Sequence, residues 1–274
     1  MFRGILICLM FLGVALGADA KTKRALIIGV GDYEQLPDLH KTTGDATGYS
    51  EAFEGQLGFE VTRLIDPGTI EFLEALDGFL QSIEPGDEVA FIFSGHGWSD
   101  GADNFLALRD APLESSEFAL RRQTVSLSND VLAEIKARRP GLLFAIIDAC
   151  RDNPFDTGTR SVTRGLSRLE IVPGTLVVYA AGARQKALDR LGPEDDSPYS
   201  VFTRSLLPRL GDPEIPLLRS VDETRSEVAV LASSINHEQR PAIYSDVSLD
   251  YCFAGECRTD VALDQETVDW VEIS

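Results

Sequence analysis

A histidine and a cysteine follow two separate apolar runs, and together these side chains could perform nucleophilic catalysis. The first run, starting at Phe91, ends Ser-Gly-His96-Gly97, and the second, starting at Ala145, ends Asp-Ala-Cys150. A thiol becomes a strong nucleophile when an imidazole takes its proton, and the imidazole can later protonate the leaving group. Cys150 and His96 are therefore a candidate nucleophile and general base for cysteine acyl transfer.

Each of these residues is preceded two positions earlier by a polar side chain, Ser94 before His96 and Asp148 before Cys150. Residues i and i+2 of a strand point to the same face, so each pair shares a face. A carboxylate beside a thiol opposes thiolate formation, because it adds a second negative charge. Asp148 is better suited to bind a cationic side chain, which predicts Arg or Lys just before the scissile bond.

The elements that must position these side chains alternate short apolar runs with helical periodicity. Strands are expected at 25–30, 59–65, 88–93, 142–147, 175–179 and near 250–253; helices are expected at 45–57, 69–83, 129–138, 201–210 and 217–235. This order implies right-handed crossovers and a largely parallel sheet with helices on both faces. Ligands bind beyond the carboxyl ends of such strands, which is where His96 and Cys150 stand.

The composition restricts the choice of partner. The chain has 44 Asp and Glu against 25 Lys and Arg, for a net charge of -19, with 44% hydrophobic residues. That acidity argues against nucleic acid or anionic lipid as the main partner, since both require a basic surface. It is typical of a soluble acidic surface, and it permits a cationic ligand.

The first 20 residues have the pattern of a secretory signal peptide. Arg3 precedes an apolar run from Ile5 to Leu16, and Ala18-Asp-Ala20 is a small-x-small cleavage site. The run is too short to span a bilayer comfortably. We expect residues 1–20 to be removed, and a periplasmic or secreted protein without a membrane span.

The four cysteines fall into different roles. Cys8 belongs to the signal peptide. Cys252 and Cys257 flank a turn at Gly255 and are predicted to form a small disulfide in an oxidising compartment. Cys150 is then the unpaired thiol.

Taken together, these motifs resemble the caspase-like cysteine peptidases of clan CD, peptidase family C14, and in particular the bacterial metacaspases or orthocaspases. The resemblance covers residues 23–253 and rests on four segments, 25–30, 91–97, 148–150 and 175–181. The spacing of His96 and Cys150, about 50 residues, agrees with caspase-type enzymes.

The resemblance implies an α/β caspase-like three-layer sandwich, with a mixed, mainly parallel sheet of about six strands and helices on both faces. It implies a cysteine endopeptidase acting on protein or peptide substrates. After the signal peptide it implies a single caspase-like domain, 21–274, with these parts: a large catalytic part of about 21–155, an irregular loop of about 156–174, a small part of about 175–260 and a C-terminal tail.

Position by position, the resemblance assigns Cys150 as nucleophile and His96 as base, with the backbone N–H groups of Gly97 and Cys150 as oxyanion donors. The pocket for a basic side chain is assigned to Asp148, Ser94 and Asp45.

The resemblance also implies self-cleavage between the two parts, for which the candidate sites are Arg160, Arg164 and Arg168. It requires no cofactor, although calcium dependence is common in metacaspases. Acidic residues are available at Asp152, Asp156, Glu194, Asp195 and Asp196, but their spacing matches no calcium loop.

The sequence is also compatible with three alternatives. Arg151 follows the cysteine where metacaspases usually have His-Ser-Gly, which is compatible with an inactive scaffold that acts by binding. Gly97 to Gly101 fits G-x-S-x-G, and Ser99, Asp148 and His237 have the order of a serine hydrolase triad; the residues after Gly101, however, have a strand pattern where the nucleophile elbow requires a helix. Zinc binding by Cys150 and His96 lacks further ligands with suitable spacing.

Overall fold

A six-stranded sheet forms the centre of the protein, in the strand order β2-β1-β3-β7-β8-β9. A computed structural model describes residues 21–100, 103–113, 116–149, 173–182 and 185–258. The strands of this sheet are β1 (Lys23–Gly29), β2 (Glu60–Ile65), β3 (Glu88–Gly95), β7 (Leu142–Ala149), β8 (Thr175–Tyr179) and β9 (Ala242–Ser245). All neighbours pair in parallel except β8 and β9, which are antiparallel.

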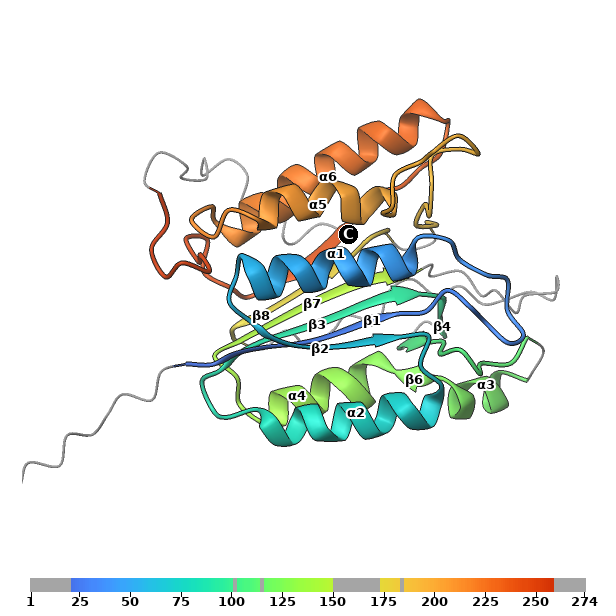
Figure 1. Cartoon of the computed structure of the whole chain (residues 1–274), viewed down its shortest axis with the longest axis horizontal. Helices are drawn as coiled ribbons and strands as arrows, with labels where there is room; N and C mark the ends of the chain where they lie inside the picture. Colours follow the sequence, from blue (N-terminus) through green and yellow to red (C-terminus); the bar gives the residue numbers. More distant parts are fainter. Residues whose placement is uncertain (1–20, 101–102, 114–115, 150–172, 183–184, 259–274) are drawn as a thin grey trace, which may run out of the picture.

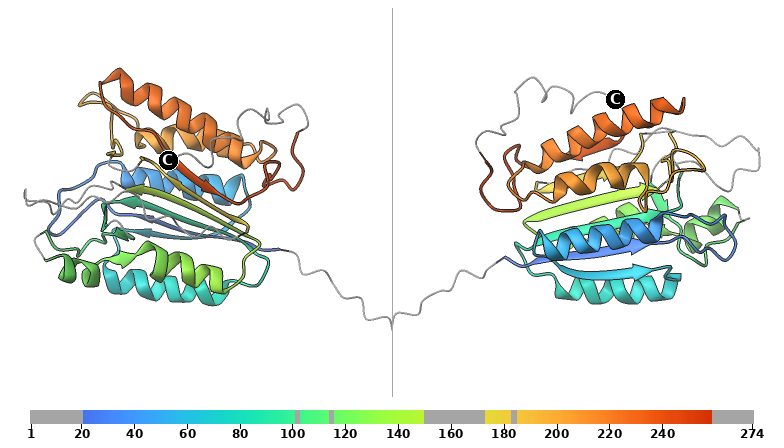
Figure 2. Two further views of the ribbon diagram at one scale, coloured as in Figure 1. Left: turned by 180° about the vertical axis from the view of Figure 1, so that it is seen from behind. Right: turned by 45° about the horizontal axis from the view of Figure 1, so that its top comes forward.

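Helices cover both faces of the sheet (Figures 1 and 2). On one face lie α1 (Thr42–Gly55), α5 (Val201–Leu210) and α6 (Leu217–Ser234), and on the other lie α2 (Thr69–Ser82) and α4 (Ala133–Ala137), which continues a π-helical turn, η1 (Leu127–Leu132). The predicted three-layer α/β sandwich with a mainly parallel sheet is therefore confirmed.

Alternate residues of the strands enter two separate cores. In β1, Leu26 and Ile28 pack in the core that includes Phe72 of α2, whereas Ile27 packs in the core that includes Phe53 of α1. Every residue of β7 is buried, and so are all residues of β3 except its first. Burial on both faces explains why these strands are continuous apolar runs in the sequence.

The chain beyond β3 forms a small second sheet of β4 (Gly97–Ser99), β5 (Asn104–Leu106) and β6 (Val125–Ser126), with α3 (Glu117–Gln123) between β5 and β6. Ser99 pairs with Asn104 in an antiparallel hairpin. A nucleophile elbow requires a helix directly after the serine. The His237 imidazole, moreover, contacts the carbonyl oxygen of Lys186. The Ser99 serine hydrolase alternative is therefore wrong.

One predicted strand is also wrong. Residues 250–253 form no strand; the last strand among the described residues is β9, which begins eight residues earlier in the chain. The apolar residues around Phe253 suggested a strand because they are buried, but they belong to a loop. Phe253 packs against the rings of Phe53, Phe59 and Phe144, at the edge of the core beneath α1.

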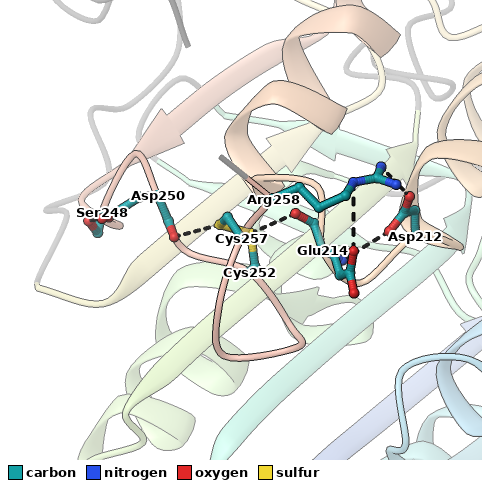
Figure 3. Close-up of a disulfide and its surroundings, with 7 residues drawn as sticks. All are labelled: Asp212, Glu214, Ser248, Asp250, Cys252, Cys257 and Arg258. Atoms are coloured by element: carbon teal, nitrogen blue, oxygen red, sulfur yellow. Dashed lines mark hydrogen bonds and ion pairs between the residues drawn. A yellow bond between two sulfur atoms is a disulfide. The ribbon is translucent and has the colours of Figure 1, made fainter. Parts of the chain in front are cut away.

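That loop contains the disulfide, which joins Cys252 and Cys257 across 5.5 Å between Cα atoms (Figure 3). Arg258 forms ion pairs with Asp212 and Glu214, in the connection between α5 and α6. The disulfide and these ion pairs hold the loop that inserts Phe253.

Both predicted parts contribute strands to the one central sheet. No helix among the described residues is long and apolar enough to cross a membrane. The expected signal peptide, the expected C-terminal tail after about residue 260 and nearly all of the expected irregular loop at 156–174 lie outside the described residues.

We expect Phe253→Ala to lower the free energy of unfolding by about 3 kcal/mol, because it empties a site in contact with four other aromatic rings. Urea unfolding followed by circular dichroism measures this change. The matched control is Phe118→Ala, since Phe118 is 70% exposed and Phe253 only 7%. Equal losses in the two variants would contradict the proposed anchoring role of the loop.

Candidate functional site

The carboxyl ends of β3 and β7 lie side by side, as the sequence predicted. In the parallel register Ser94 faces Asp148, and Gly95 faces Ala149. His96 directly follows β3, and Cys150 follows Ala149 in the chain. Cys150 itself lies outside the described residues, so the geometry of the site is given by the residues around it.

The backbone of His96 is held on both sides. Its N–H donates to the hydroxyl of Tyr33 at 2.7 Å, and its carbonyl accepts from the N–H of Ala107 at 3.0 Å. The same Tyr33 hydroxyl donates to the carbonyl of Ala107 at 3.2 Å. A side chain at Gly95 would come within 2.8 Å of this hydroxyl, so the glycine before His96 permits the arrangement.

The imidazole of His96 is oriented by the backbone carbonyl of Pro37, which lies 2.8 Å from Nε2. A carbonyl oxygen can only accept, so Nε2 carries the proton of the neutral ring and Nδ1 has the free lone pair. Burial lowers the pKa of His96, while the bond to Pro37 and the charge of Asp189 oppose that shift. The ring is therefore kept neutral and able to act as a base.

Three predicted pocket residues, Asp45, Asp148 and Ser94, are brought together by the fold. The Ser94 hydroxyl donates to Asp45 at 2.8 Å. Ser200, the N-cap of α5, connects the two carboxyls: its N–H donates to Asp45 at 2.8 Å and its hydroxyl to Asp148 at 2.6 Å. Asp45 is fully buried and Asp148 is 7% exposed.

These side chains line one pocket at the ends of the strands. Its walls come from β3, β7, α1 and the segment before α5: Leu39, Thr42, Asp45, Ser94, Gly95, Asp148, Ala149, Ala187, Asp189 and Ser200. A third carboxylate, Asp189, thus joins the two that were predicted. Asp189 carries no distinguishing signal in so acidic a chain, whereas Ser200 could have been found as the N-cap of the helix predicted at 201–210.

The two buried carboxyls resist ionisation. Burial raises the pKa of Asp148 to about 8, and the charge of Asp45 adds to this shift. Burial likewise raises the pKa of Asp45 to about 6, against its hydrogen bonds with Ser200 and Ser94. Among the described residues, no Lys or Arg contributes to either shift. A cation entering the pocket would stabilise both carboxylates.

The family described as the caspase domain matches residues 22–251 of the chain. The chain belongs to this caspase-like family of cysteine peptidases. The predicted family and its fold are thereby confirmed.

Two curated relatives share part of the sequence. Human mucosa-associated lymphoid tissue lymphoma translocation protein 1 is 28% identical over 138 residues, which is 50% of this chain and 16% of the relative. The mouse homologue has the same identity and the same coverage. The match thus spans about a sixth of either relative's own length.

Only some of the remaining predicted site residues lie in the described part of the chain. Gly97 is buried at the start of β4, directly after His96. Seven further residues named in the sequence analysis lie outside the described part of the chain: Cys150, Arg151, Asp152, Asp156, Arg160, Arg164 and Arg168. Of the predicted calcium candidates that are described, Asp195 pairs with Arg204. The described residues contain no group of three or more His, Cys, Asp or Glu placed to hold a metal ion.

We expect Asp148→Asn to stabilise the protein relative to the wild type as the pH rises from about 4 to 8. The folded protein holds the Asp148 proton more tightly than the unfolded chain, in which an aspartate has its ordinary pKa of 3.8. Rising pH therefore favours unfolding of the wild type, and Asn removes this effect. Thermal unfolding at pH 5 and pH 8.5 measures it.

The control for this measurement is Asp212→Asn, which removes a half-buried carboxylate paired with Arg258. If both variants change the pH dependence of the melting temperature equally, the buried carboxyl is not its source.

Proposed function

We propose that the protein is a cysteine endopeptidase that cleaves peptide bonds after Arg or Lys, with Cys150 as nucleophile and His96 as base. The observation that carries the proposed preference for Arg or Lys is a pocket whose lining includes Asp45, Asp148 and Asp189. It lies at the ends of the strands that lead to His96 and Cys150.

The proposed reaction has two steps. Nδ1 of His96 takes the Cys150 proton, and the thiolate attacks the carbonyl carbon of the scissile bond. The N–H groups of Gly97 and Cys150 stabilise the oxyanion. The C–N bond then breaks, the His96 proton passes to the leaving amine, and a thioester remains on Cys150. Water, deprotonated by His96, attacks this thioester. The C–S bond then breaks, the Cys150 thiolate leaves and takes the proton from His96, and the new carboxyl terminus is released.

A basic side chain would also assist the chemistry itself. In the empty pocket, negative charge on Asp148 would oppose a thiolate two residues away. A bound guanidinium or ammonium group offsets that charge and keeps the carboxylates ionised. Binding of a cationic residue therefore favours both correct placement of the scissile bond and activation of Cys150.

We also propose that the protein is exported. The support is the signal-like pattern of residues 1–20 together with the Cys252–Cys257 disulfide, since disulfides persist in oxidising compartments. N-terminal sequencing of the mature protein tests this; an intact N-terminus in the cytoplasmic fraction would contradict it.

An inactive scaffold is the second candidate, and Arg151 in place of the usual family histidine is the feature that favours it. A wild-type protein that binds Arg peptides but cleaves none, with or without calcium, would support the scaffold.

We expect Cys150→Ala and His96→Ala each to lower kcat/KM on a fluorogenic Arg peptide by at least about 1,000-fold, because the two residues act as one unit. Ser99→Ala is the control and should retain activity, since its hydroxyl donates to the Asp103 carbonyl in the hairpin. Gel analysis of the same proteins reports self-cleavage, which Cys150→Ala should abolish. Activity lost only in Ser99→Ala would overturn the proposal.

We expect Asp148→Asn to lower the ratio of kcat/KM for Arg peptides over citrulline peptides by about tenfold or more, because citrulline has the shape of arginine without its charge. The wild-type ratio should rise between pH 5.5 and 8.5, as Asp45 and Asp148 lose their protons. Protonation of His96 and Cys150 affects the rates on both peptides equally, so it does not change their ratio at a given pH. A ratio that is independent of pH, or a preference for Asp peptides, would contradict the pocket assignment.

A further inference from the structure

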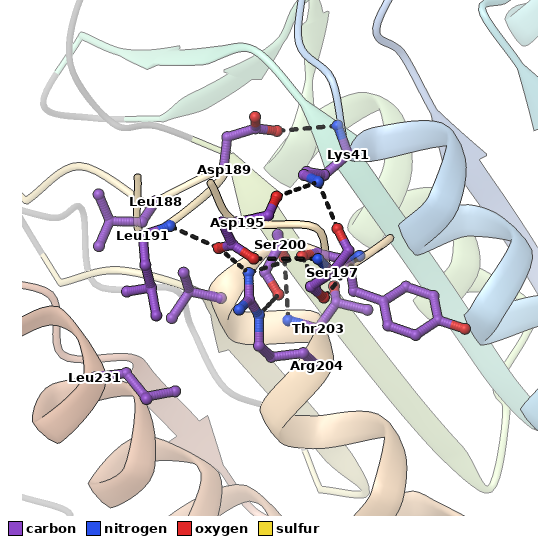
Figure 4. A network of polar contacts seen from close by, with 12 residues as sticks. Lys41, Leu188, Asp189, Leu191, Asp195, Ser197, Ser200, Thr203, Arg204 and Leu231 are labelled. Carbon is purple, nitrogen blue, oxygen red and sulfur yellow. Dashed lines mark hydrogen bonds and ion pairs between the residues drawn. The ribbon is translucent and has the colours of Figure 1, made fainter. Parts of the chain in front are cut away.

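Two pocket residues that the sequence did not predict, Asp189 and Ser200, lie near opposite ends of one irregular segment, which we call the 188–200 loop. This loop has no helix or strand to fix its shape. Its internal hydrogen bonds instead converge on Asp195 (Figure 4). The Asp195 carboxylate accepts the N–H of Leu191 at 2.7 Å and that of Ser197 at 3.2 Å.

Arg204, one turn into α5, ties the loop to that helix. Its guanidinium donates to Asp195 at 2.5 Å, to the Tyr199 carbonyl at 3.1 Å and to the Ser200 carbonyl at 3.3 Å. The planar guanidinium can make these contacts together because its donors point in several fixed directions. One side chain thus holds the middle of the loop and its junction with α5.

Lys41 connects the loop to α1, the second helix beside the pocket. Its backbone N–H donates to the carboxylate of Asp189 at 3.0 Å, and its ammonium group donates to the carbonyls of Asp195 and Ser197. Lys41 is the N-cap of α1, the helix that carries Asp45. On the same helix, a side chain at Gly44 would lie 2.0 Å from the Pro198 carbonyl, so the loop packs directly on α1 there.

The ion pair between Asp195 and Arg204 is largely shielded from solvent, with side chains 8% and 20% exposed. The hydrogen bond from Arg204 is the largest of the effects that lower the pKa of Asp195 to about 2. Asp195 therefore stays ionised throughout the pH range in which Asp45 and Asp148 titrate.

We propose that the Asp195–Arg204 ion pair is a positioning element of the specificity pocket: it holds the 188–200 loop so that Asp189 and Ser200 face a bound cationic side chain. This inference rests on the proposed function, and it names the part of the fold on which the preference for Arg or Lys depends. Asp195 and Arg204 act through Asp189 and Ser200, and neither lines the pocket.

The test is Asp195→Asn, which preserves size but removes the charge that attracts Arg204. We expect KM for the Arg peptide to rise about tenfold, since small displacements of positioning groups have effects of this order. The rate on the citrulline peptide should stay within about twofold of the wild type, because the Cys150–His96 pair is untouched. Asp212→Asn is the matched control: it also breaks an Asp–Arg ion pair, but in the connection between α5 and α6.

Arg204→Lys provides a second variant in case Asp195→Asn folds poorly. Lysine keeps the positive charge but cannot contact Asp195 and both carbonyls at once. We expect a smaller loss of preference for Arg over citrulline, with a melting temperature close to that of the wild type. If both variants fold and keep the wild-type preference, the inference is wrong. Equal losses on the two peptides would also overturn it, since they would indicate general damage to the site.

Binding of agmatine, a free arginine-like cation, separates this inference from the proposed function. It is measured by calorimetry on Cys150→Ala, alone and combined with Asp195→Asn. Weaker agmatine binding in the double variant supports the positioning role even if the wild type cleaves no peptide, in which case only the peptidase proposal fails. Equal binding in the two proteins overturns the positioning role whether or not the wild type cleaves.

Discussion

Asp45 and Asp148 are buried beside the ends of the central strands, and the arrangement of the residues around them depends on this burial. Two carboxyls removed from water, with no cation from the described residues beside them, must take up protons or receive a cation from outside. The surrounding donors, Ser94 and Ser200, satisfy their oxygens without neutralising them. A site built for stability alone would use apolar residues there. Buried acids at these positions lower the stability of the fold, and such local destabilisation is typical of functional sites.

The central strands were predictable because they are buried on both faces. Their continuous apolar runs fix where β3 and β7 end, and His96, Asp148 and Cys150 stand at those ends. The sheet order then brings the two ends together. The placement of Ser94 and Asp148 side by side could therefore be predicted from the sequence, and their register agrees with that prediction.

The sequence pattern could not predict the contacts of residues that lie in irregular segments. Tyr33 and Pro37 precede α1, and Asp189 precedes α5; no periodicity marks such residues, because tertiary contacts alone decide what they touch. The mistaken strand near Phe253 has the same origin, since a loop buried by aromatic packing has the composition of a strand. Periodicity reports burial, and it cannot distinguish a buried loop from a buried strand when the segment is short.

The orientation of His96 by the Pro37 carbonyl has a consequence for how the site tolerates change. In many catalytic sites a carboxylate orients the histidine, so one substitution removes the orienting group and one proton can neutralise it. A peptide carbonyl has neither weakness: every residue type at position 37 would supply it, and it does not titrate. The group that orients His96 is thus insensitive to the side chain at position 37 and to pH, and it depends on the path of the backbone between β1 and α1.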